Sequence, residues 1–184
     1  MAAVLLAAGP VGTRPAAAGV VSHGPVVAVG FAEKLGRDMV IPTFGWRVEL
    51  GACERVAGWM SRIGTELTFP IESTLGVITG DEDEVEFQVV PMLRFEPLGL
   101  QESPLIPFLE GGIGLMYTGL DDLRLGSNIL FSDNVAVGVS LPLPAPLPGN
   151  RVSVSYRYRH SSHAGLWAES NSGLNTHYLV LTFE

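Results

Sequence analysis

From Pro25 onward the chain alternates apolar and polar residues with a period of two, and Gly, Pro, Asp and Asn separate the alternating segments. In the most regular segment, Phe87 and Val89 alternate with Glu86 and Gln88. A period of two is typical of β-strands, because successive side chains of a strand point to opposite faces, whereas an amphipathic helix repeats about every 3.6 residues. The sequence therefore predicts an all-β protein.

About eight strands can be drawn from these segments. They cover 26–31, 40–50, 63–69, 84–96, 109–117, 134–141, 152–162 and 175–184. The first is short. Between the second and third, the spacing of Cys53, Val56, Met60 and Ile63 is also compatible with a short helical turn.

The composition points to a membrane setting. Hydrophobic residues make up 47% of the chain and charged residues 16%, and the mean hydropathy is +0.31. Gly, Pro and charged residues interrupt every apolar run before it reaches the roughly 20 residues that a transmembrane helix needs. A chain of this kind would cross a bilayer as strands.

The two faces of the predicted strands differ in chemistry. One face carries large branched and aromatic side chains, and the other carries charges of both signs: Arg47, Glu49, Glu66, Glu86, Arg94, Glu110, Arg157 and Arg159. A small soluble barrel cannot hold so many bulky side chains inside. We therefore expect an eight-stranded antiparallel transmembrane β-barrel of the outer-membrane type, with strands of about 9 to 11 residues. The alternative is a soluble lipocalin-like carrier, with Phe87, Leu93 and Val137 pointing into a cavity.

The remaining composition limits partners and domains. Residues 1–18 resemble a secretory signal without its basic start, or a disordered tail, and residues 25–184 form one predicted barrel domain. The net charge of −8 argues against nucleic-acid binding. Cys53 is the only cysteine and has no metal-ligand spacing around it, so we predict neither an internal disulfide nor a metal site.

A candidate base and nucleophile follow each other at the end of the seventh strand. By parity, His160 and Ser162 lie on the apolar, lipid-facing side, with about 6.6 Å between their α-carbons. A neutral imidazole can activate a serine hydroxyl for attack on an ester. In the simplest hairpin register Ser162 lies opposite Asn175 and His160 opposite His177. Asn175 can then orient His160.

These residues resemble a known family. The segment Phe108–Leu115, and above all His160–Gly165 followed by Asn171, Gly173 and Asn175, is similar to the lipid A 3-O-deacylases, also called acyloxyacyl hydrolases. The resemblance implies an esterase of the bacterial outer membrane that removes the 3-linked acyl chain of lipid A in lipopolysaccharide, without a cofactor. Ser162 stands in the place of the nucleophile and His160 in that of the base.

The sequence departs from the family pattern at two positions. His163 replaces an asparagine that helps to stabilise the oxyanion, and the backbone N–H groups from His163 through Ala164 to Gly165, or the nearby Asn171, are the substitutes. Asn175 replaces a glutamate, for which Glu169 in the loop is a second candidate. Two interpretations follow: an active deacylase, or a catalytically weak or inactive barrel that serves as a structural or partner-binding part of an envelope complex.

Four other interpretations stay open. Tyr156, Tyr158 and His160 can form an aromatic belt at the membrane interface without any chemistry. The acidic run at 81–84 can bind divalent cations that bridge lipid phosphates, although such runs are usually just solvated. A metal site of His160, His163, His177 and Glu169 is disfavoured by strand parity. The sequence does not decide whether the barrel forms a homodimer.

Overall fold

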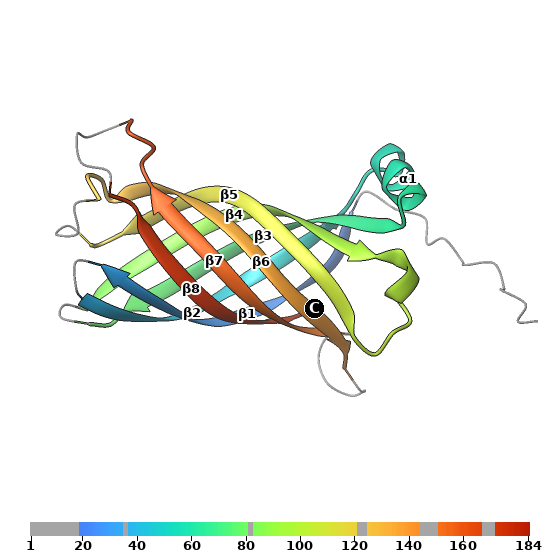
Figure 1. Cartoon of the computed structure of the whole chain (residues 1–184), viewed down its shortest axis with the longest axis horizontal. Helices are drawn as coiled ribbons and strands as arrows, with labels where there is room; N and C mark the ends of the chain where they lie inside the picture. The colour runs from blue at the N-terminus through green and yellow to red at the C-terminus, as the bar shows by residue number, and fades with distance from the viewer. Residues whose placement is uncertain (1–18, 35–36, 81–82, 121–124, 144–150, 167–171) are drawn as a thin grey trace, which may run out of the picture.

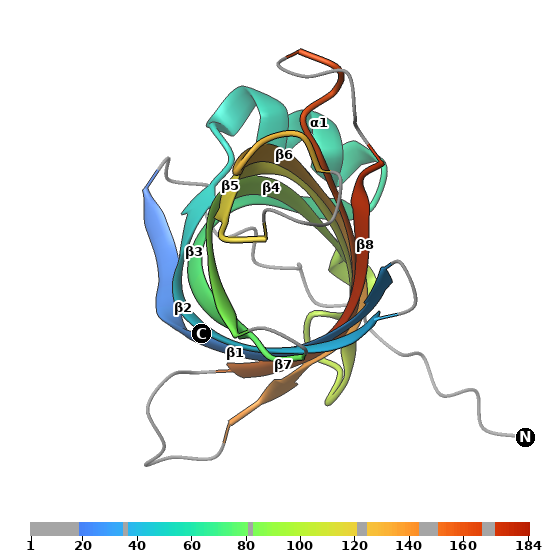
Figure 2. The ribbon, with the colours of Figure 1, turned by 90° about the vertical axis from the view of Figure 1, so that its left-hand side faces the viewer.

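The computed structural model describes residues 19–34, 37–80, 83–120, 125–143, 151–166 and 172–184. These residues form a closed antiparallel barrel in which each strand pairs with the next and β8 closes on β1 (Figures 1 and 2). The strands are β1 (Val20–Lys34), β2 (Arg37–Gly51), β3 (Thr65–Ile78), β4 (Glu84–Pro97), β5 (Ile106–Thr118), β6 (Ile129–Pro142), β7 (Arg151–Ser162) and β8 (Leu174–Phe183). The predicted eight-stranded architecture is confirmed.

The barrel is apolar outside and polar inside. Phe87, Leu93 and Val137 are 46%, 40% and 59% exposed on the outer wall, so the lipocalin-like alternative is wrong. The inward residues of the same strands are buried and largely polar, among them Glu86, Gln88 and Arg94 on β4. An outward apolar wall around a polar interior is the pattern of a barrel that is solvated by lipid.

Ion pairs fill the middle of the interior. Arg159 donates two hydrogen bonds to the carboxylate of Glu86, of 2.6 and 2.7 Å, and the Tyr178 hydroxyl donates to the same carboxylate at 3.0 Å. Arg157 similarly pairs with Glu72, with one hydrogen bond of 2.9 Å. Bidentate pairing satisfies both groups where water is excluded. The small cavity beside these pairs measures about 10 Å³, which is room for about one water molecule.

A second charged cluster lies toward the end of the barrel where β1 begins. Arg94 contacts Glu96, Glu110 and Glu184, and Arg47 also pairs with Glu110. All five side chains are buried. The predicted charged lining is confirmed for seven of its eight residues, whereas Glu66 is exposed near the start of β3. Glu72, Glu96 and Glu184 are further buried carboxylates of the interior.

Every strand except β8 is longer than predicted, and the eight strands have 10 to 15 residues. The first predicted strand began only at Val26, yet Gly24 of β1 pairs with Arg47 inside the ladder. A Cβ at Gly24 would lie 1.8 Å from the carbonyl oxygen of Phe183, so the glycine serves close strand packing and not a turn. In β3 the strand continues past Pro70, which still pairs with Glu49 of β2.

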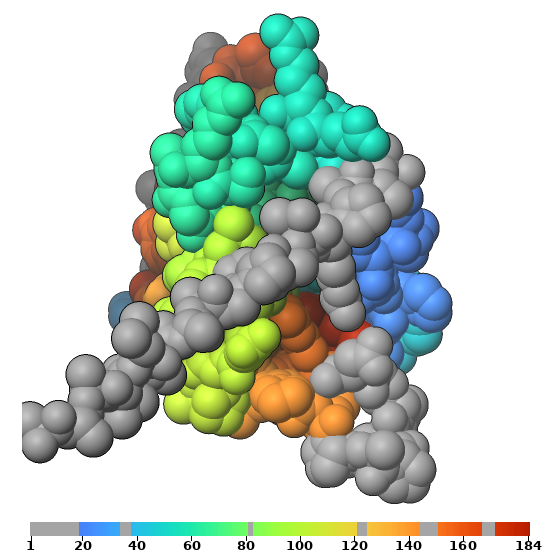
Figure 3. Space-filling view, turned by 90° about the vertical axis from the view of Figure 1, so that its right-hand side faces the viewer, coloured from blue at the N-terminus to red at the C-terminus, as the bar shows by residue number. Residues whose placement is uncertain are grey.

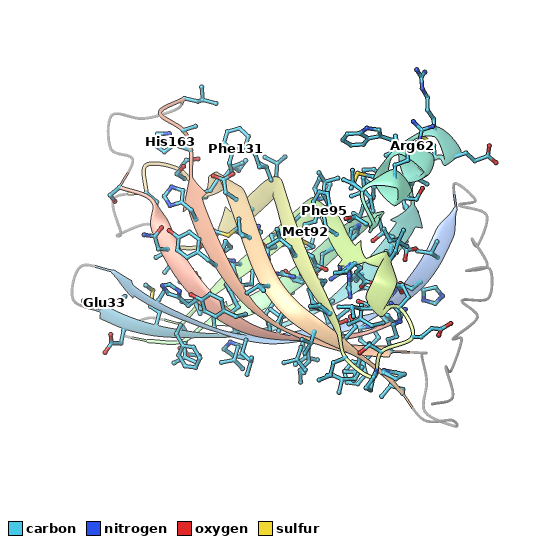
Figure 4. All side chains as sticks on the ribbon, turned by 45° about the vertical axis from the view of Figure 1, so that its right-hand side comes forward. Glu33, Arg62, Met92, Phe95, Phe131 and His163 are labelled. Carbon is cyan, nitrogen blue, oxygen red and sulfur yellow. The ribbon has the colours of Figure 1, made fainter. Side chains whose placement is uncertain are left out.

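The segment between β2 and β3 is helical, which was the second interpretation of its spacing. It forms α1 (Glu54–Arg62), and a short 3-10 turn, η1 (Leu98–Leu100), follows β4 at the same end. This end also holds the start of β7 and the end of β8, while His160 and Ser162 lie at the opposite end. Figure 4 shows Arg62 of α1 at one end and His163 with Phe131 at the other. In the described part of the chain, no helix is long and apolar enough to cross a membrane.

Candidate active site

The candidate residues lie on the outer wall where β7 ends. Along this strand Arg159 and Ser161 are fully buried and point into the barrel, while His160 and Ser162 are partly exposed on the outer face. Ser161 contacts the Met116 sulfur inside the barrel at 3.6 Å. The strict alternation of β7 therefore puts His160 and Ser162 on the lipid-facing side at the edge of the apolar wall.

Asn175 holds the imidazole of His160. The distance between the His160 Nδ1 and the Asn175 Oδ1 is 2.7 Å. The predicted register of this hairpin was wrong by two residues, because His160 pairs with Asn175 and His177 pairs with Tyr158. A shift of two keeps every side chain on its face. The shift brings Asn175 directly beside His160, whereas the predicted register put it beside Ser162.

Gly173 packs closely against the imidazole ring of His160. A Cβ at this position would lie 2.6 Å from the His160 Cε1 and 3.2 Å from its Nε2, so any side chain would displace the ring. The backbone of Gly173 also has a φ of +58°, which glycine adopts without strain. Both features make residue 173 part of the packing around the imidazole.

The chain turns sharply after Ser162. The Leu166 N–H donates to the His163 carbonyl at 3.0 Å, and Ala164 and Gly165 between them have φ values of +54° and +76°. Two positive φ values in this position are those of a type I′ turn. The His163 side chain is fully buried, so the candidate oxyanion donors here are backbone N–H groups. Glu169 and Asn171 lie outside the described residues.

Ser162 has a cross-strand partner on β6 but none in the described ladder with β8. On β6 it pairs with Phe131, and in the described part of the chain no hydrogen bond joins its hydroxyl to His160. The residue is partly exposed on the outer wall. Hydrogen bonds between nucleophile and base are often long in unliganded sites and shorten when substrate binds.

Asp133 is a charged neighbour that the sequence reasoning missed. It is exposed on the outer face of β6 and is the cross-strand partner of His160, on the side opposite Asn175. Directly opposed side chains lie about 5 Å apart. Strand parity was a usable signal, because Asp133 shares the apolar face of Val135 and Val137, where a carboxylate is costly unless it has a role.

The aromatic residues nearby form a separate group. The rings of Tyr156 and Tyr158 both contact His177 of β8, with centroids 6.0 and 5.5 Å apart. His160 contacts Asn175 instead, so it is set apart from the aromatic belt that was considered for it. The described residues contain no group of three His, Cys, Asp or Glu side chains that could hold a metal.

Comparison with known proteins decides the family. The sequence model of the lipid A 3-O-deacylase (PagL) family matches residues 42–184, which is most of the chain and includes His160, Ser162 and Asn175. This chain belongs to the PagL family. The family assignment agrees with the resemblance that the His160–Gly165 segment suggested. None of the curated proteins compared with the chain matches it significantly in sequence.

Solved structures agree with the PagL assignment at the level of the fold. The crystal structure of the outer membrane enzyme PagL is 20% identical, has a TM-score of 0.68, and aligns over 86% of this chain and 99% of its own. Neisserial surface protein A (NspA) is 17% identical, has a TM-score of 0.53, and aligns over 87% of this chain and 92% of its own. This PagL-family chain therefore shares the barrel fold of both proteins.

Proposed function

We propose that this chain is a lipid A 3-O-deacylase in which Ser162 is the nucleophile and His160 the base. The observation that carries the proposal is the 2.7 Å hydrogen bond between His160 and Asn175 on the outer wall. An ester that links an acyl chain to a sugar lies at the boundary between the apolar and polar parts of a lipid. The last two outward residues of β7 lie at the corresponding edge of the apolar wall.

The hydrogen bond with Asn175 sets the tautomer of His160. An amide oxygen is only an acceptor, so the proton of the neutral imidazole must be on Nδ1. The lone pair is then on Nε2, the nitrogen that is free to act as a base. Asn175 thus supplies the orienting part of the role that a carboxylate has in other serine hydrolases.

The reaction follows from these roles. His160 Nε2 takes the proton of Ser162 as the serine Oγ attacks the ester carbonyl carbon. The tetrahedral intermediate then collapses, the C–O bond to the sugar breaks, and His160 returns the proton to the sugar oxygen. Water attacks the acyl-serine in the second half, His160 again transfers the proton, and the fatty acid leaves. No oxidant, reductant or cofactor is consumed.

Asp133 supplies the charge that Asn175 lacks. His160 is positively charged in both transition states, and a neutral amide does not offset that charge. A carboxylate on the neighbouring strand stabilises the imidazolium through space without contacting the substrate. Asp133 is therefore a positioning and electrostatic residue of the site. Asn175 orients His160 and Asp133 offsets its positive charge, two roles that a single acidic residue has in other triads.

Substituting Asp133→Asn should lower kcat about tenfold and leave KM little changed. The reason is that the charge is lost while the side-chain shape is kept, and partial exposure screens the interaction. Fatty-acid release from detergent-dispersed lipid A measures the effect. The matched control is Asn175→Glu, which returns a carboxylate to the other side of His160 and should raise kcat in the Asp133→Asn background. Equal kcat in wild type and Asp133→Asn would remove Asp133 from the mechanism.

Mass spectrometry of lipid A tests the function itself. Cells with an intact 3-linked acyl chain are compared with and without expression of the protein, after its presence in the outer membrane has been verified. We expect a lipid A species that lacks one ester-linked hydroxyacyl chain, with the amide-linked chains unchanged. Identical lipid A in both cultures would support the alternative of an inactive barrel with a structural or partner-binding role.

A further inference from the structure

The surface of α1 that faces away from the barrel has no partner among the described residues. Trp59 and Ile63 are each 61% exposed, although Met60 on the neighbouring face of the helix is only 4% exposed. α1 stands outside the barrel wall beyond β2 and β3 (Figures 1 and 2) and forms a projection in the space-filling view of that end (Figure 3). An exposed tryptophan on a short helix, together with an exposed isoleucine directly after the helix, indicates a contact surface.

The arrangement of side chains around α1 fits a membrane surface. Residues four and seven apart share a face, so Arg55, Trp59 and Arg62 follow one another along one side of the helix, with Ile63 next to them. Met60 lies further round and is buried. Exposed aromatic and aliphatic side chains next to arginines are typical of helices that lie in the headgroup region of a bilayer.

The position of α1 is continuous with the lipid-facing wall. β3 follows α1 in the chain and carries Ile71 and Leu75 on its outer face, where they are 41% and 56% exposed. Leu67, on the same outer face but next to α1, is only 9% exposed. A helix that stands outside the wall at the end of this apolar band overlies the lipid that surrounds the barrel, and a soluble partner would have to displace that lipid.

We propose that α1 and Ile63 anchor the barrel in the headgroup region of the phospholipid leaflet, with Trp59 and Ile63 in the upper acyl region and Arg55 and Arg62 on anionic phosphates. The choice of leaflet rests on the proposed function. If the His160 end of the barrel binds lipopolysaccharide in one leaflet, α1 at the other end of the barrel lies in the opposite leaflet. Contacts at both ends fix the height of the barrel, and thereby the depth of Ser162 relative to the ester.

Fluorescence quenching tests the anchor. The substitutions Trp46→Phe and Trp167→Phe leave Trp59 as the only one of the three tryptophans in the chain. This variant is refolded into vesicles of phosphatidylcholine and phosphatidylglycerol. We expect lipids brominated near the headgroup to quench Trp59 more strongly than lipids brominated deep in the chain. Arg55→Gln with Arg62→Gln should reduce the quenching in proportion to the phosphatidylglycerol content.

The control is the protein that keeps only Trp46, an outward residue of β2 that is 48% exposed on the wall. Quenching of Trp46 shows that the barrel has inserted. If Trp46 is quenched while Trp59 emits as in water and responds to neither brominated lipid, the anchor is refuted and the face is left for a protein partner. Deacylation is not read out, so an inactive site leaves this test intact.

Discussion

The Ser162→Ala protein should fold as the wild type does and release fatty acid from lipid A at least about 1,000-fold more slowly, because loss of the nucleophile in serine hydrolases leaves only the catalysis that comes from binding and oxyanion stabilisation. Ser162 is on the outer face and its side chain makes no hydrogen bond to another described residue, so we expect the substitution to leave the fold intact. Fatty-acid release by purified protein in detergent measures the rate, and heat-modifiable migration on gels verifies folding.

The matched control is the neighbouring serine. Ser161→Ala makes the same chemical change one residue earlier, but Ser161 is fully buried inside the barrel, away from lipid. We expect this variant to keep its rate within about twofold of the wild type, since its hydroxyl contacts only the Met116 sulfur among the described residues. Equal losses of activity in the two variants would show that the hydroxyl of Ser162 has no chemical role.

The Glu86→Leu protein should be destabilised by about 3–5 kcal/mol, because the substitution leaves the buried guanidinium of Arg159 without its carboxylate. Arg159 is 0% exposed, and Glu86 accepts both of its bidentate hydrogen bonds and one from Tyr178. Unfolding in urea, followed by tryptophan fluorescence in lipid vesicles, measures the free energy of unfolding. Arg159 directly precedes His160, so the rate of deacylation should fall as well.

A second substitution separates the buried charge from the lost packing. Adding Arg159→Met to Glu86→Leu removes the unpaired charge and fills the space with apolar groups, so it should restore most of the lost stability. If the free energy of unfolding of the Glu86→Leu protein lies within about 1 kcal/mol of the wild-type value, the Glu86–Arg159 pair does not stabilise the barrel as its burial indicates.

The face on which each side chain of a strand lies was the feature of the structure that the sequence predicted most reliably. Since side chains of a strand alternate between faces, the identity of Arg157 and Arg159 as inward residues and of His160 and Ser162 as outward ones followed from spacing alone. Glu72 was missed for a local reason. The predicted third strand ended at Phe69, directly before Pro70, but within a closed barrel one missing N–H interrupts the ladder without ending the strand.

The geometry around His160 needed information that spacing does not contain. Hairpin register depends on the path of the intervening loop, and a shift of two residues changes every cross-strand partner while it preserves parity. The sequence therefore predicted that Asn175 pairs with Ser162, whereas in the structure it pairs with His160. Asp133 is 27 residues from His160 in sequence, and only the β6–β7 pairing joins them.

Labelling with a long-chain alkyl fluorophosphonate tests most directly whether the outer wall at the end of β7 bears an activated serine. The reagent transfers its phosphonyl group to an activated serine oxygen with loss of fluoride, and tandem mass spectrometry locates the added mass. We predict modification of Ser162 in the wild type, none at Ser161, and strongly reduced labelling in His160→Ala. A folded protein in detergent that stays unlabelled at Ser162, or that is labelled equally without His160, would contradict the proposed site.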